Sequence, residues 1–141
     1  MPNLSQQFLF ALGTGTTTAT SVIIPTNAVS SDGNYTFTSR PEKGDGYFGS
    51  GDGLHTVTFT VTPQFAGTLT MQATLAVEPI EIDWFNVDDA SVTYGSTLTN
   101  TVLTTTTNYV NFTGNFVWVR AKVERAAGIP TGSVQFINYN H

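Results

Sequence analysis

The chain has 141 residues, no cysteine, a net charge of −5 and only 11% charged residues, against roughly 25% in an ordinary soluble domain. This composition excludes disulfide frameworks and thiolate metal sites, and its five cations are too few to engage a nucleic-acid backbone or an anionic membrane. No apolar run approaches the roughly 20 residues of a membrane-spanning helix.

Threonine, with 25 copies, supplies the polarity that charges would normally provide. Its branched Cβ is stiff and suits a pleated strand better than a helix. The composition therefore predicts β-structure before any pattern is considered.

The first 30 residues have no positively charged start and only a short apolar stretch at 8–12, so we expect no secretory signal and folding in a cytoplasm. Residues 1–30 are either part of one domain spanning 1–141 or an N-terminal arm or edge segment. Short strands are predicted at 22–24 and 35–38. The Gly/Thr-rich stretches 13–20 and 95–107 are loops or edge strands, and we favour ordered edges.

Residues 40–53 contain five glycines together with Asp45 and Asp52. Such loops can wrap calcium, but this spacing lacks the order of an EF-hand and the GK[ST] of a phosphate-binding loop. We predict a long surface loop that contacts a neighbouring subunit.

The clearest alternation runs over 55–62, where valine and phenylalanine alternate with threonine. After Pro63 and the Ala66-Gly67 turn, residues 68–75 alternate again, with Leu69 and Leu75 among those expected inside. We predict a hairpin over 54–76.

Further strands are predicted at 84–87, 91–94, 109–112, 115–124 and 133–139, with the last two paired together. Eight to ten short strands with closely spaced turns predict an all-β fold, an antiparallel β-sandwich of the jelly-roll or immunoglobulin-like kind.

Catalytic groupings are absent from the sequence pattern. His55 and His141 are expected at the surface, have no triad partners and show no metal-ligand spacing. A glycosidase needs two carboxyl groups that face one another across a sugar. Such a pair could come from a cluster of five carboxylates, Glu78, Glu81, Asp83, Asp88 and Asp89, but these residues fall on predicted turns, where acidic residues are common for backbone reasons. We predict no enzyme activity, no cofactor and no metal.

An interaction surface is the better prediction. Trp118 shares its strand face with Arg120 and Lys122, so it is either covered by another chain or capped by a loop. With aromatic residues of the two loops, the candidate surface comprises Trp118, Arg120, Lys122, Trp84, Tyr47 and Phe48.

The runs 67–79, 83–85 and 111–123 and the closing Asn138-Tyr-Asn-His141 resemble virion structural proteins of tailed phages, particularly contractile-tailed cyanobacterial phages, over about residues 67–141. The resemblance implies a subunit of a capsid, neck, tail or fibre that is assembled in the host cytoplasm and located in the virion. It implies a homo-oligomer, such as a trimer, that contacts other virion proteins.

The alternative is a carbohydrate-binding or adhesin module that recognises a surface glycan on a host receptor. Trp84, Trp118 or Tyr94 would then be the rings on which a sugar stacks.

Overall fold

The computed structural model describes residues 6–25, 28–30, 33–49, 53–97, 100–101, 105–125 and 132–140. Eleven strands lie in these residues, together with a one-turn helix and a 3-10 turn. None of the helices in these ranges is long and apolar enough to cross a membrane.

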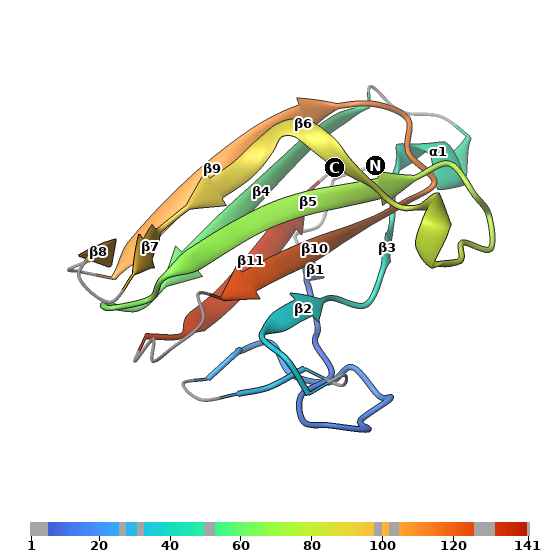
Figure 1. The fold of residues 1–141 in the computed structure, drawn as a ribbon. Helices are drawn as coiled ribbons and strands as arrows, with labels where there is room; N and C mark the ends of the chain where they lie inside the picture. Colours follow the sequence, from blue (N-terminus) through green and yellow to red (C-terminus); the bar gives the residue numbers. More distant parts are fainter. Residues whose placement is uncertain are drawn as a thin grey trace.

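Two antiparallel sheets pack face to face (Figure 1). The first has the order β1-β11-β4-β9, and the second has the order β2-β10-β5-β6 with β3 also paired to β10. A separate pair is formed by β7 and β8. The strands are β1 Gln6–Gln7, β2 Thr36–Thr38, β3 Glu42–Lys43, β4 Leu54–Val61, β5 Gly67–Thr74, β6 Phe85–Thr93, β7 Gly95–Thr97, β8 Asn100–Thr101, β9 Thr106–Thr113, β10 Trp118–Arg125 and β11 Val134–Asn140; helix α1 covers Asp45–Phe48 and the 3-10 turn η1 covers Glu81–Asp83.

The predicted all-β antiparallel sandwich is confirmed. Alternate residues of the central strands meet between the sheets, as with Val57 and Phe59 of β4 and Leu69 of β5, all fully buried. The sequence favours ordered edge strands for both 95–107 and 13–20. The first stretch contains the paired strands β7 and β8, whereas residues 13–20 contain no strand.

Both predicted pairings of consecutive strands are wrong. β4 pairs with β9 and β11, while β5 pairs with β6 and β10, so the predicted hairpin strands lie in opposite sheets. β10 and β11 are likewise separated between the two sheets. The strand positions were correct because alternation is local, whereas pairing depends on which sheet covers each apolar face. Leu75, expected inside, lies just beyond the end of β5 and is 66% exposed.

His55 also departs from its prediction. It lies in phase with Val57, is fully buried, and stacks on Phe112 with the ring centroids 4.8 Å apart. Its Nδ1 is 2.7 Å from the Tyr139 hydroxyl and its Nε2 is 2.7 Å from the Gly114 carbonyl oxygen. Since a carbonyl only accepts, Nε2 carries the proton and Nδ1 accepts from Tyr139. His141 lies outside the described residues.

The described part of the N-terminal segment packs on the sandwich. β1 pairs with β11, and the side chains of Phe8 and Phe10 join the core at 0% and 1% exposure. The guanidinium of Arg125 donates to backbone carbonyls at Pro25 and Ala28. That residues 1–141 form one domain stays a prediction.

Candidate functional site

Five of the six residues of the predicted interaction surface lie at one end of the five-stranded sheet, on its outer face; Lys122 lies further along β10. Trp118, Arg120 and Lys122 alternate along β10 with Val119, Ala121 and Val123, which are fully buried on the inner face. Helix α1 and the loop 75–83 approach this end of the sheet (Figure 1). We call the aromatic–amide surface the set Tyr47, Phe48, Trp84, Trp118, Gln72 and Asn86.

Tyr47 is the most direct neighbour of Trp118. Their ring centroids are 5.1 Å apart, and the Lys43 ammonium lies 4.5 Å from the centre of the Tyr47 ring. Tyr47 and Phe48 are 42% and 53% exposed. Two large aromatic rings are therefore available to solvent at this end of the sheet.

The Gly-rich segment positions Tyr47 because it docks on the backbone of 115–117. The amides of Gly44 and Gly46 donate to the carbonyls of Val117 and Phe116, at 2.9 and 2.8 Å. A Cβ on Gly46 would lie 2.2 Å from the Asn115 carbonyl oxygen, so only glycine permits this approach. The described part of this predicted surface loop is thus packed against its own chain.

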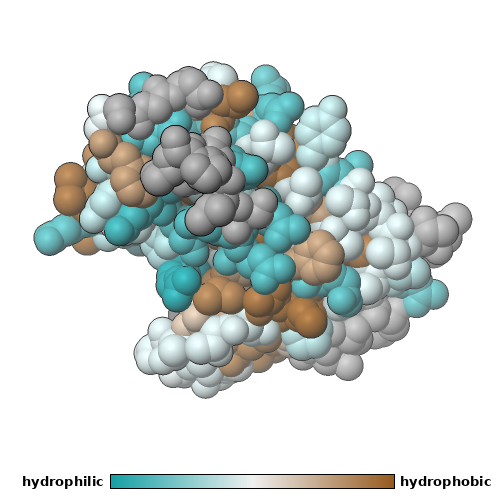
Figure 2. Space-filling view, turned by 180° about the vertical axis from the view of Figure 1, so that it is seen from behind, coloured by the Kyte–Doolittle hydropathy of each residue, from teal (hydrophilic) through white to brown (hydrophobic). Residues whose placement is uncertain are grey.

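Trp118 is partly covered by a loop of the same chain, one of the two possibilities considered above. Its indole Nε1 donates to the carbonyl of Val77 at 2.9 Å. The covering loop exposes aliphatic side chains itself, including Val77 at 69% and Ile82 at 85%. Brown apolar groups accordingly protrude at this end of the molecule, while much of the face seen in Figure 2 is neutral or hydrophilic.

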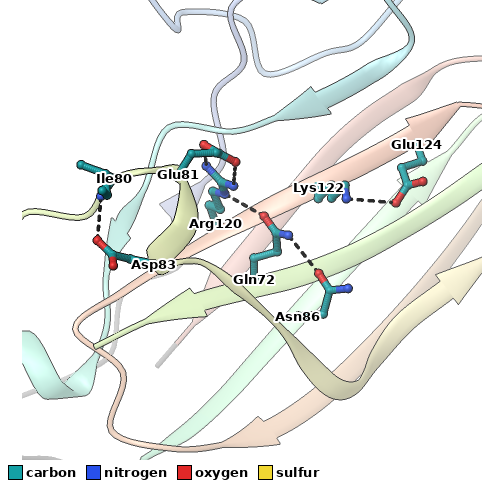
Figure 3. Close-up of polar contacts among 8 residues, drawn as sticks. All are labelled: Gln72, Ile80, Glu81, Asp83, Asn86, Arg120, Lys122 and Glu124. Atoms are coloured by element: carbon teal, nitrogen blue, oxygen red, sulfur yellow. Dashed lines mark hydrogen bonds and ion pairs between the residues drawn. The ribbon is translucent and has the colours of Figure 1, made fainter. Parts of the chain in front are cut away.

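A hydrogen-bonded row of side chains crosses the outer face beside these rings (Figure 3). Arg120 donates from its two terminal nitrogens to Glu81, at 2.6 and 3.3 Å, and from Nε to Oε1 of Gln72 at 2.8 Å. Gln72 Nε2 then donates to Oδ1 of Asn86 at 2.9 Å. The row runs from β10 across β5 to the edge strand β6.

Arg120 holds this row in place more than it offers contacts of its own. Its side chain is only 8% exposed, and its guanidinium carbon lies 4.3 Å from the centre of the Trp84 ring. The hydrogen bond from Arg120 lowers the pKa of Glu81 below its ordinary value, which keeps the carboxylate charged in the pair. Trp84 is thereby fixed above the sheet.

Lys122 lies further along β10 and forms a 3.4 Å ion pair with Glu124. It shares the face of Trp118 and Arg120 but forms none of the cation–π pairs found in the described part of the chain.

Sequence reasoning missed Gln72, Asn86 and the role of Glu81. Alternation alone makes Gln72 one more outward-facing residue of a Thr-rich strand, and only the register Arg120↔Gln72↔Asn86 across three strands gives it a role. Tyr94 was proposed as a sugar platform, but it is 5% exposed and packs against Phe65, so that prediction is wrong.

The described residues include no group of three His, Cys, Asp or Glu side chains that could hold a metal ion. The Asp45 carboxylate of the Gly-rich segment is buried and accepts from the Gly53 amide at 2.8 Å. Asp52 lies outside the described residues.

A scan against protein-family models and a search of curated proteins give no match. Solved structures do show similarity. The carbohydrate binding module CBM6cm-2 of lichenase 5A from Cellvibrio mixtus, in complex with cellotriose, is 16% identical with a TM-score of 0.41, covering 96% of this chain and 89% of that one. The xylan-binding module CBM15 is 12% identical with a TM-score of 0.43, covering 99% and 97%. The family 29 module CBM29_1 from Piromyces equi is 11% identical with a TM-score of 0.38, covering 100% and 93%.

These neighbours correct the expectation of a phage virion structural protein, since all three are carbohydrate-binding modules and none is a virion component. The predicted contacts with other virion proteins depended on that expectation and are no longer supported. Self-association and the absence of enzyme activity stay predictions. At these TM-scores and identities the likeness carries no argument for what this chain binds.

Proposed function

We propose that this chain is a carbohydrate-binding module that holds a glycan on the aromatic–amide surface. The observation that carries the proposal is the pairing of two neighbouring rings, the exposed Tyr47 and the partly covered Trp118, with a side-chain amide row whose orientation is fixed.

A sugar ring has an apolar face of C–H groups and an equator of hydroxyls, so it needs both kinds of contact. Aromatic rings such as Tyr47 and Trp118 bind the apolar face, and the hydroxyl of a tyrosine can make polar contacts at the ring's edge. The neighbouring amides offer hydrogen bonds to hydroxyls. Because Arg120 and packing hold these groups before a ligand arrives, little side-chain freedom is lost on binding.

The test is a glycan array probed with the intact chain, followed by calorimetric titration of the glycans that bind. Tyr47→Ala should weaken binding by about tenfold or more, since stacking area is lost without disturbing a hydrogen bond of the row. Tyr109→Ala is the matched control, because Tyr109 is 68% exposed on β9 in the other sheet.

Retention of full glycan affinity by Tyr47→Ala would refute this placement of the site. An array without any binding glycan would refute the function itself.

A further inference from the structure

A groove of about 510 Å³ lies between the first half of β6 and the end of β9. These are the outermost strands of their sheets on the same side of the sandwich, and they run next to one another (Figure 1). Its lining includes side chains from both strands and from the start of β4: Leu54, Phe85, Asn86, Asp88, Asp89 and Asn111.

Strand β6 departs from regular pairing beside this groove. Between the register partners Gln72↔Asn86 and Thr70↔Ser91, β5 advances two residues while β6 advances five. The additional residues include Asp88 and Asp89, and Asp89 has a φ of +60°, in the left-handed region. A bulge that carries two polar side chains out of an edge strand re-aims them, and such irregularities gather at binding sites.

The groove presents hydrogen-bond acceptors. Within the described ranges, neither Asp88 nor Asp89 has a side-chain hydrogen bond or an ion pair, and no lysine or arginine lines the groove. Both residues are exposed to solvent. Ionised carboxylates can only accept hydrogen bonds, so a ligand that binds these two groups must donate hydrogen bonds to them.

The groove also presents donors, and the row on the outer face determines which atoms they are. Arg120 can only donate, so Gln72 must turn its oxygen toward Arg120 and its nitrogen toward Asn86. Asn86 therefore accepts through Oδ1 and keeps its Nδ2 hydrogens for another partner (Figure 3). On the opposite strand, Asn111 Oδ1 is likewise occupied, by the Thr56 hydroxyl at 2.8 Å.

An exposed ring completes the groove. Phe85 is 42% exposed and packs edge-on against Phe116, with centroids 5.8 Å apart, and Leu54 on the β4 side is 48% exposed. The groove thus combines an apolar platform with carboxylates that accept hydrogen bonds and amide nitrogens that donate them.

Resting on the proposed carbohydrate function, we propose that this groove is a second subsite for a neutral sugar unit, continuous with the aromatic–amide surface through Asn86. A sugar hydroxyl both donates and accepts, which suits carboxylates and amides together. A uronic acid would be repelled by Asp88 and Asp89. An ammonium group would leave the amide donors without acceptors.

The experiment titrates the 15N-labelled intact chain with cellohexaose, xylohexaose, hexagalacturonate and trilysine, and follows amide chemical shifts at both sites. A neutral hexasaccharide should shift the resonances of 85–89 and Asn111 together with those around Tyr47. Phe85→Ala and the double variant Asp88→Asn/Asp89→Asn should each weaken hexasaccharide binding by about tenfold. Phe136→Ala, 36% exposed on β11 and outside both surfaces, is the matched control.

Shifts confined to the residues around Tyr47 and Trp118, with Phe85→Ala binding normally, would overturn the groove and leave the proposed function standing. Preferential perturbation of 85–89 by trilysine or by hexagalacturonate would overturn the neutral-sugar assignment. No response to either neutral hexasaccharide at either site would count against both proposals.

Discussion

Two buried tyrosines show how much the surroundings of one hydroxyl matter. Tyr139 donates to His55 from within the core, whereas the Tyr94 hydroxyl is buried without a hydrogen-bond partner in the described structure. Burial raises the pKa of Tyr94 to about 12, so the phenol stays neutral at ordinary pH. A tyrosine hydroxyl therefore stabilises the fold at position 139, where it has a hydrogen-bond partner, and destabilises it at position 94, where it has none in the described structure.

We therefore expect Tyr94→Phe to leave the free energy of unfolding unchanged or to raise it by about 1 kcal/mol, because an unpaired buried polar group is removed. Tyr139→Phe should lower it by about 1–3 kcal/mol, because His55 Nδ1 loses its donor. Urea denaturation of both variants measures the difference. Equal losses would contradict these hydrogen-bond assignments.

The Glu81–Arg120 pair predicts a pH response at the residue scale. The folded-state pKa of Glu81 is lowered from 4.5, so the pair contributes stability above the unfolded pKa and loses it as pH falls through the folded value. We expect Trp84 to leave the guanidinium as the solution is acidified below about pH 4.5. Glu81→Gln should remove this acid transition.

The readout for that transition is tryptophan fluorescence rather than global stability. Burial raises the pKa of Glu42, so Glu42 favours folding in the opposite pH direction and would obscure a melting curve. A variant Trp118→Phe leaves Trp84 as the single tryptophan of the chain. Acid behaviour of Trp84 that is identical with and without the Glu81 carboxylate would refute the coupling.

At the scale of elements, α1 depends on close backbone contact. Gly46→Ala should lower the free energy of unfolding by about 1–3 kcal/mol, because its Cβ would meet the Asn115 carbonyl oxygen at 2.2 Å. Glycan affinity should fall with it, since α1 carries Tyr47.

Gly49→Ala is the comparison for this variant. Gly49 has open space around it but a φ of +75°, so alanine there reports the backbone penalty alone, about 1 kcal/mol. Thermal melts of both variants, with titration of a bound glycan, measure the difference. A Gly46→Ala loss no larger than that of Gly49→Ala would show that α1 is not held by this contact.

For the molecule as a whole, the described part of the N-terminal segment contributes to the shared core. The side chain of Phe10 is 1% exposed, and its backbone forms isolated antiparallel β-bridges with Ser21 and Ser39. Phe10→Ala should therefore cost about 3–5 kcal/mol and shift one cooperative transition, not create a second one. Calorimetry, with Phe136→Ala as an exposed control, measures both quantities. An unchanged main transition would mean that this segment folds apart from the sandwich.

Much of this fold follows from the sequence alone. Alternation of Val, Phe and Leu with Thr located the strands around 54–61 and 67–74 within one residue and indicated their inward faces, because side chains alternate strictly along an extended backbone. The same rule placed Trp118, Arg120 and Lys122 together on one face of β10. The sequence also predicted the Gly-rich segment as a connection between strands, although not the surface on which it docks.

Only the tertiary structure decided which strands pair and which polar groups meet. Consecutive strands β4 and β5 lie in opposite sheets because each buries its apolar face against the other layer, and the five residues between them allow the crossing. The row from Glu81 to Asn86 joins residues from η1, β10, β5 and β6, so its members are neighbours only through strand register. A sequence determines the faces of its strands locally, but register between distant strands is set by the packing of the whole core.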